Sequence, residues 1–145
     1  MSFMNDRNSK KSVLFTCKNN SGRSQMAEGL FKQFYGDKFN VYSGGIDPKM
    51  LNHLTVEVMA EIGIDISDIS SNHLREYQGQ EFDYIVTLCN DENCILSLNV
   101  ENLIHYEFSD PATYNNGNMG DIEVFRIIRD EIREWIQNSL SKKIR

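Results

Sequence analysis

The 145-residue sequence has few cysteines, few prolines and no long apolar stretch. Its three cysteines are too few for the disulfide framework of a small secreted domain. No apolar run approaches membrane-spanning length, and residues 1–11 lack the apolar core of a signal peptide. We therefore expect a cytoplasmic protein with reduced thiols, whose cysteines serve redox chemistry, metal binding or packing.

Positive charge is also scarce. The 21 acidic residues outnumber the 15 lysines and arginines and give a formal net charge of −6. Nucleic acids and anionic membranes attract basic surfaces, so neither is an expected partner, and a bound anion would have to be held by local geometry. With 40% hydrophobic and 25% charged residues, the composition is that of an ordinary globular protein. We expect a flexible segment over residues 1–11 and one domain over residues 12–145.

Strand and helix patterns alternate along the chain. Four apolar runs have the length of buried strands: residues 12–16, 39–43, 84–88 and 103–106. Four segments are predicted to be helical: residues 24–35, 51–62, 71–78 and 122–140. This alternation predicts an α/β fold in which helices cover both faces of a parallel sheet and ligands bind at the carboxyl ends of its strands. Cys17 and Cys89 each follow a predicted strand and should lie at that edge.

The loop after the first predicted strand carries the most informative motif, in which five residues separate Cys17 from Arg23. Its small and polar residues allow backbone N–H groups to face a tetrahedral anion, and the following helix adds its positive end. The Arg23 guanidinium can bind two oxygens of the anion at once. The positive field of the loop and the helix end favours the thiolate of Cys17, which is the nucleophilic form. The predicted oxyanion-binding residues are Lys18, Asn19, Asn20, Ser21, Gly22, Arg23 and Ser24. The alternative is that Cys17 only packs at a strand end.

A second constellation contains Cys89 and Cys94. As a metal site it would offer two thiolates and His105, which is one ligand short of a closed zinc site. As packing, one buried cysteine would be unremarkable, but Cys94 lies in an acidic, polar stretch. As a redox relay, Cys89 would attack a sulfur at Cys17 and Cys94 would then attack Cys89, which uses every cysteine of the chain.

Asp110 precedes Pro111 in a predicted loop. An acid opposite the nucleophile can protonate a departing oxygen, which an oxyanion-transfer reaction needs. The alternative is a simple turn, because Asp-Pro pairs are common in turns.

These motifs together resemble a known family. The strings that carry the resemblance are Cys17-x5-Arg23-Ser24, Gln25-Met-Ala-Glu-Gly29, Tyr42-Ser-Gly-Gly-Ile46, Gly63-Ile-Asp-Ile-Ser67, Val86-Thr-Leu-Cys89, Asp110-Pro111 and Arg129-Asp-Glu-Ile132. In this order they resemble the thioredoxin-coupled arsenate reductases, which share their fold with the low-molecular-weight protein tyrosine phosphatases. The resemblance covers the chain from about residue 12 to the C-terminal helix.

The resemblance implies a four-stranded parallel sheet and a catalytic domain with its oxyanion loop at Cys17 to Arg23. It implies that Asn20 and Ser24 hold the loop and the thiolate through hydrogen bonds, and that Asp110 is the general acid. No cofactor is required, although members of the reductase branch can bind a potassium ion near three residues that correspond here to Asn20, Glu28 and Ser43.

Two departures from the family pattern bear on these expectations. Gly22 stands where both branches usually have a second loop cysteine, so Cys89 is left as the resolving thiol of Cys17. Asn72 stands where the potassium-binding relatives have an aspartate.

The activity that the resemblance implies is reduction of arsenate to arsenite. Cys17, Cys89 and Cys94 would form a disulfide relay, and thioredoxin or a similar dithiol protein would reduce it. The main alternative is a phosphatase in which water replaces Cys89 as the second attacker on a cysteinyl phosphate, with Tyr114 beside the substrate ring. A non-enzymatic oxyanion or redox sensor is a third alternative, and it leaves Asp110 without a role.

Overall fold

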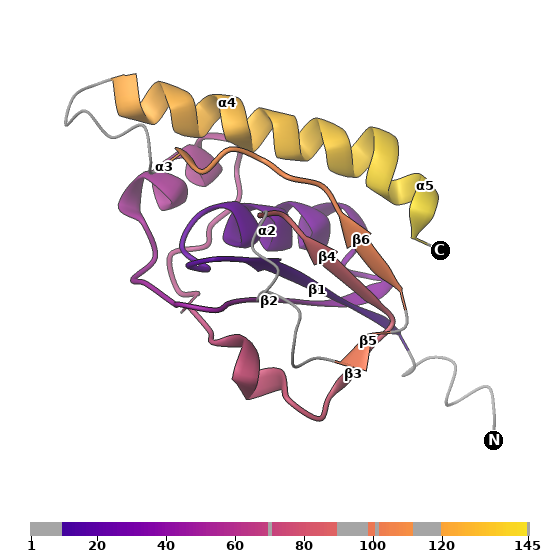
Figure 1. Ribbon diagram of the computed structural model, residues 1–145. Coiled ribbons are helices and arrows are strands. Elements are labelled where there is room, and N and C mark those ends of the chain that lie inside the picture. Colours follow the sequence, from indigo (N-terminus) through magenta and orange to yellow (C-terminus); the bar gives the residue numbers. More distant parts are fainter. Residues whose placement is uncertain (1–9, 70, 90–98, 101, 112–119, 145) are drawn as a thin grey trace.

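The central element of the fold is a four-stranded parallel sheet with the strand order β2-β1-β4-β6 (Figure 1). The computed structural model describes residues 10–69, 71–89, 99–100, 102–111 and 120–144. The strands of the sheet are β1 (Lys11–Cys17), β2 (Phe39–Gly45), β4 (Tyr84–Thr87) and β6 (Leu103–His105). A separate parallel pair joins β3 (Glu81–Phe82) to β5 (Asn99–Val100). The predicted four-stranded parallel sheet is confirmed.

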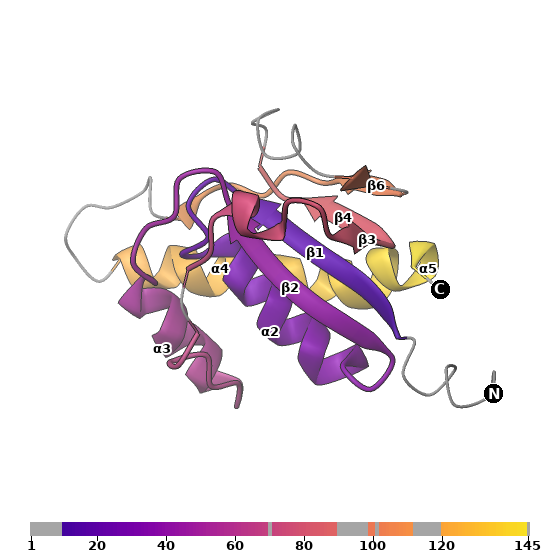
Figure 2. The same cartoon turned by 90° about the horizontal axis from the view of Figure 1, so that it is seen from below.

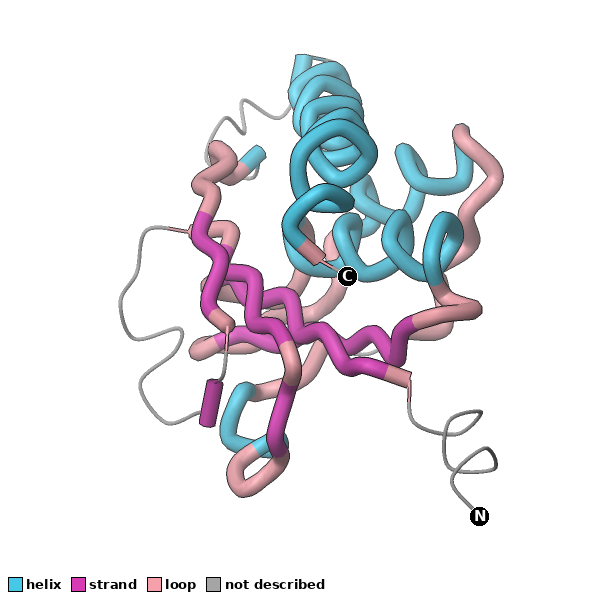
Figure 3. Tube along the Cα trace, turned by 90° about the vertical axis from the view of Figure 1, so that its right-hand side faces the viewer, coloured by secondary structure: helices cyan, strands magenta, loops and turns pink. Residues whose placement is uncertain are grey.

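The α-helices lie together on one face of this sheet (Figures 1 and 2). They are α2 (Arg23–Tyr35), α3 (His53–Glu61) and α4 (Gly120–Trp135), and α4 continues through a π-helical turn (Ile136–Leu140) into α5 (Ser141–Lys143). The opposite face carries the short 3-10 helix η1 (Leu74–Tyr77), visible in Figure 3 as the small helical piece below the strands. Both faces are therefore covered, one by long helices and the other by η1 and its flanking chain.

The alternation of side chains along β1 divides the core between the two faces. Val13 and Phe15 enter the larger cluster, in which Phe15 and Phe31 of α2 pack edge to face with ring centroids 5.6 Å apart. Leu14 enters the smaller cluster on the other face, together with Leu74 of η1 and Ile85 of β4. Because all four strands are parallel, their carboxyl ends lie at one edge of the sheet.

Several element boundaries differ from the sequence-based expectations. β1 begins at Lys11, one residue inside the segment expected to be flexible, and residues 1–9 lie outside the described part of the chain. The helix expected over residues 71–78 is the shorter η1, because a local capping box starts it: the His73 ring accepts from Arg75 N, and Glu76 accepts from His73 N. Among the described residues, no helix is long and apolar enough to cross a membrane.

Candidate active site

The loop between β1 and α2 wraps closely around the end of β2. Cys17 is the last residue of β1, and Arg23 is the first residue of α2. Asn20 adopts a left-handed conformation with φ 48°. A Cβ built on Gly45 of β2 would lie 2.6 Å from the Lys18 carbonyl oxygen and 2.8 Å from Asn20 N, so only glycine allows this approach. The expected sequence of strand, tight loop and helix is present.

Hydrogen bonds place a hydroxyl against the Cys17 sulfur. The Cys17 Sγ lies 2.9 Å from Ser24 Oγ, and both residues are buried. The Asn20 side-chain amide donates to the same Ser24 oxygen over 2.7 Å. Since that oxygen accepts from Asn20, its own hydrogen is available for the Cys17 sulfur. The structure thus places Asn20 and Ser24 where the family resemblance assigned them.

The strained turn at Asn20 is held from several sides. Its side-chain oxygen accepts from Asn72 N over 2.8 Å and from Gln25 Nε2 over 3.2 Å. Its backbone carbonyl accepts from Ser71 Oγ over 2.9 Å. Sequence reasoning did not give Gln25, Ser71 or Gly45 this role, although the Gly-Gly pair at the end of a predicted strand is a signal of close backbone approach.

Arg23 connects the loop to the segment that carries the predicted general acid. Its Nη1 donates to the Phe108 carbonyl oxygen over 3.1 Å, and its Nη2 lies 3.5 Å from Asp110 Oδ2. The Arg23 side chain is 9% exposed and that of Asp110 is 28% exposed, so the pair sits at the rim of the loop. No acidic residue lies in the first turn of α2, and its positive end is available to an anion. Asp110 therefore lies within reach of a group bound in the loop.

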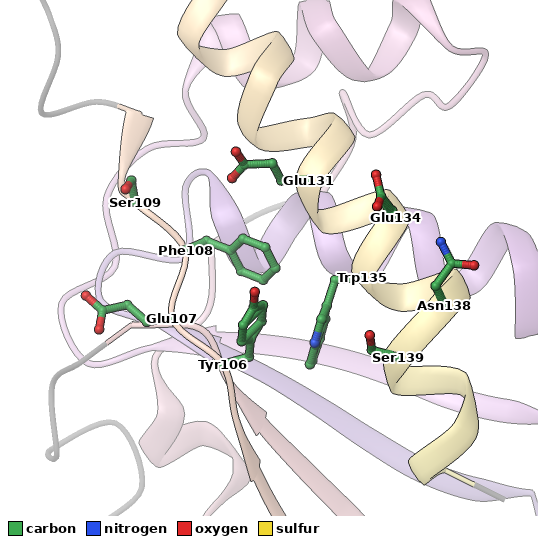
Figure 4. A pocket seen from close by; sticks show the side chains of 9 residues that line it. All are labelled: Tyr106, Glu107, Phe108, Ser109, Glu131, Glu134, Trp135, Asn138 and Ser139. Carbon is green, nitrogen blue, oxygen red and sulfur yellow. The ribbon is translucent and has the colours of Figure 1, made fainter.

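An aromatic wall holds the segment before Asp110 (Figure 4). Tyr106 and Trp135 of α4 stack with centroids 5.1 Å apart, and Phe108 meets Trp135 edge to face at 5.7 Å. A cavity of about 450 Å³ opens beside these rings, and it is lined by Tyr106, Glu107, Phe108, Ser109, Glu131, Glu134, Trp135, Asn138 and Ser139. None of these residues belongs to the loop at Cys17. These ring contacts hold the chain just before Asp110 against α4. The aromatic residues themselves are not part of the predicted oxyanion site.

The structure brings Cys89 to the same buried cluster as Cys17. Both residues are thiols, not disulfides, and both belong to the smaller core cluster with Leu74. Leu88 N donates to the Thr16 carbonyl oxygen over 2.9 Å, which fixes the chain entering Cys89 beside the end of β1. Cys94 and Tyr114 lie outside the described residues.

The zinc alternative depends on Cys94, which lies outside the described residues. Among the described residues, no group of three or more His, Cys, Asp and Glu side chains is placed to hold a metal ion. The His105 ring is instead paired with the Thr87 hydroxyl through Nδ1.

The three residues expected near a potassium ion do lie together. Asn20 donates to Ser43 Oγ over 3.0 Å, and Ser43 in turn donates to one carboxylate oxygen of Glu28. The other Glu28 oxygen pairs with the ammonium group of Lys32, one helical turn further along α2. The Asn20 side chain faces Ser43 with its NH₂ group, and its side-chain oxygen already accepts a hydrogen bond from Asn72 N. This arrangement does not fit a potassium ion, because Lys32 already supplies the positive charge and few oxygen atoms remain to coordinate one.

The comparison with known protein families agrees with the geometry. The model of the low molecular weight phosphotyrosine protein phosphatase family matches residues 12–145. The chain belongs to this family. The match confirms the family that the motifs predicted. Together with the curated relatives it shows that the chain is an enzyme.

Two curated relatives cover nearly the whole chain. It is 40% identical over 130 residues to an arsenate reductase of Halalkalibacterium halodurans, covering 88% of this chain and 94% of the relative. It is 42% identical over 132 residues to arsenate reductase 2 of Staphylococcus haemolyticus, covering 89% and 95% respectively.

Solved structures agree with the fold. An arsenate reductase in the phosphate binding state has a TM-score of 0.77 at 30% identity, covering 91% of this chain and 98% of that chain. A low molecular weight protein tyrosine phosphatase from T. tengcongensis, at 24% identity and a TM-score of 0.67, covers 92% and 99% and shows the shared fold.

Proposed function

We propose that this protein reduces arsenate to arsenite. The observation that carries the proposal is the buried cluster shared by Cys17 and Cys89, at the foot of a loop built to hold an oxyanion. A phosphatase reaction uses the loop but has no need of a second buried thiol beside it. The names of the relatives and the phosphate bound by a similar reductase support an oxyanion substrate.

In the first step, arsenate binds in the loop and the Cys17 thiolate attacks arsenic. A sulfur–arsenic bond forms, and one arsenate oxygen leaves as water after Asp110 donates a proton to it. Arg23 and the backbone N–H groups of the loop stabilise the remaining oxygens. The 3.5 Å pair between Arg23 and Asp110 keeps the acid beside the bound oxyanion.

In the second step, the Cys89 thiolate attacks the Cys17 sulfur. A disulfide forms, the sulfur–arsenic bond breaks, and its electron pair stays on arsenic, which leaves as arsenite. Arsenic gains two electrons, and the two cysteines together lose two. Cys94 then attacks Cys89 and releases the Cys17 thiolate, and a thioredoxin-like dithiol protein of the cytoplasm reduces the Cys89–Cys94 disulfide.

The Cys89→Ser variant tests the relay. It should bind arsenate or phosphate as the wild type does, because Cys89 is not part of the loop, but it should form no arsenite. The matched control is Cys94→Ser, which should release one arsenite per chain and stop as the Cys17–Cys89 disulfide. Normal arsenite turnover by Cys89→Ser would contradict the proposal.

A phosphatase is the second candidate, because the family match and the Cys17, Arg23 and Asp110 arrangement satisfy it without further residues. Its test is hydrolysis of p-nitrophenyl phosphate by the wild type and by Cys89→Ser. Equal and efficient hydrolysis by both proteins, without arsenite formation by the wild type, would favour this candidate.

A further inference from the structure

Thr55 is a buried residue beside the oxyanion loop that the proposed reaction does not use. It lies in the first turn of α3 and is 0% exposed. Its Oγ1 donates to the Ser21 carbonyl oxygen over 3.1 Å. Buried polar side chains are usually hydrogen-bonded, so the choice of partner is informative. Here the partner is a backbone carbonyl group inside the loop.

The Ser21 carbonyl oxygen lies at the N-terminus of α3. Besides the Thr55 hydroxyl, it accepts from Asn52 N over 3.1 Å. Asn52 is the N-cap residue of the helix, and its side chain accepts from Leu54 N. A helix N-terminus carries partial positive charge and free N–H groups, which favour an oxygen atom placed there. Two donors and the helix end thus fix the direction of this carbonyl group.

The two earlier carbonyl groups of the loop are held by the segment that joins β2 to α3. Asp47 N donates to the Lys18 carbonyl oxygen, and Lys49 N donates to the Asn19 carbonyl oxygen, both over 2.9 Å. These donors are backbone groups, which a side-chain substitution cannot remove. The hydroxyl of Thr55 is a side-chain donor, so substitution at Thr55 can test what these contacts do for the loop.

A held carbonyl group also determines the direction of the next N–H group. Among the described residues no peptide bond is cis, and in a trans peptide the N–H points away from the C=O of the same unit. Because the Ser21 carbonyl points at α3, the Gly22 N–H points away from that helix. Backbone N–H groups turned to a common interior form an anion-binding concavity. The α3 side is filled by the helix, so an anion held by the Gly22 N–H lies on the other side.

We propose that the Thr55 hydroxyl orients the Ser21–Gly22 peptide so that the Gly22 N–H binds the oxyanion. The inference rests on the proposed function, in which the loop between Cys17 and Arg23 holds arsenate. Thr55 is a positioning residue, because it acts on the anion only through this peptide. No bond is made or broken at Thr55 during the reaction.

Three variants isolate the hydroxyl. Thr55→Val replaces the hydroxyl by a methyl group of similar shape, and Thr55→Ser keeps the hydroxyl and loses the methyl group. Thr16→Val is the matched control, because Thr16 is also 0% exposed but its hydroxyl has no hydrogen-bond partner in the described part of the chain. In calorimetric titrations Thr55→Val should bind phosphate about fivefold more weakly than the wild type, as the loss of one hydrogen bond predicts. Thr55→Ser and Thr16→Val should stay within about twofold of it.

The amide signal of Gly22 separates positioning from a general contribution to stability. The chain has 9 glycines, so isotope labelling of glycine gives a simple NMR spectrum, and Gly22→Ala identifies the Gly22 signal by its loss. Phosphate should move the Gly22 amide proton downfield in the wild type and in Thr55→Ser, because the N–H then donates to an anion. At saturating phosphate the shift should be smaller in Thr55→Val. A purely structural role would lower the melting temperature and leave this shift unchanged.

A phosphate-induced Gly22 shift of wild-type size in Thr55→Val would overturn the inference. A loss of phosphate affinity in Thr55→Ser as large as that in Thr55→Val would also overturn it. Neither measurement needs arsenate reduction. If the wild type binds phosphate but forms no arsenite, the proposed reductase activity fails, while the phosphate measurements still decide the role of Thr55.

Discussion

Replacing Gly45 by alanine should weaken oxyanion binding, although Gly45 itself lies outside the predicted oxyanion loop. A Cβ at this position would lie 2.6 Å from the Lys18 carbonyl oxygen, 2.8 Å from Asn20 N and 3.0 Å from the Cys17 carbonyl oxygen. All three atoms are backbone atoms of the loop, so no flexible side chain can move aside. Either β2 or the loop must shift by several tenths of an ångström to restore ordinary contact distances.

Such overpacking costs about 1–3 kcal/mol of folding free energy. The effect on the site should be larger, because a misplacement of about 1 Å in a reacting group lowers the rate by about a hundredfold. The assays are thermal unfolding, calorimetric titration with phosphate, and arsenite formation. We expect a Gly45→Ala protein that folds, melts several degrees lower, and binds phosphate at least tenfold more weakly.

Gly22→Ala is the matched control within the same loop. A Cβ on Gly22 would lie 3.6 Å from the Thr55 hydroxyl oxygen, which is an ordinary contact. This variant should bind phosphate within a few-fold of the wild type. Wild-type phosphate affinity in Gly45→Ala would refute the reasoning that β2 shapes the loop by close backbone approach.

Three further predictions concern charged and titratable groups. Arg23→Lys replaces the planar fork by a point charge and should lower kcat/KM for arsenate by about 10²–10³-fold with little change in melting temperature, and an unchanged kcat/KM would contradict this. Exchanging sodium for potassium should leave the wild-type melting temperature unchanged, whereas Lys32→Gln, which removes the cation from Glu28, should gain stability with added potassium. Burial, followed by the charge of Glu28, raises the pKa of Tyr77 to about 12. The neutral phenol therefore contributes stability that is complete below pH 10 and is lost as the pH rises to about 12, and Tyr77→Phe should lack this loss in denaturant titrations at alkaline pH.

The local parts of the fold could be predicted from the sequence because short-range patterns determine them. The apolar run before Cys17 and the helical spacing after Arg23 predicted β1 and α2 to within a residue or two. The helix predicted over residues 71–78 was too long, because the capping contact between His73 and Glu76 starts η1 only at Leu74.

The long-range parts of the site could not be derived from spacing. The contact of Arg23 with Asp110 joins segments far apart in the chain, and no short-range pattern specifies it. The contact of Gly45 with the loop depends on the register between β1 and β2, which no short pattern specifies. The pairing of Lys32 with Glu28 could have been predicted from the sequence, since residues four apart are neighbours on a helix.

A single turnover tests the central claim most directly. Fully reduced wild-type protein would be mixed with excess arsenate and no external reductant, then assayed for arsenite and for disulfides by mass spectrometry. The proposed relay predicts about one arsenite per chain, the yield of one dithiol, together with a Cys89–Cys94 bridge. No arsenite and three intact thiols would contradict the account and leave a phosphatase reaction at Cys17 as the function of this site.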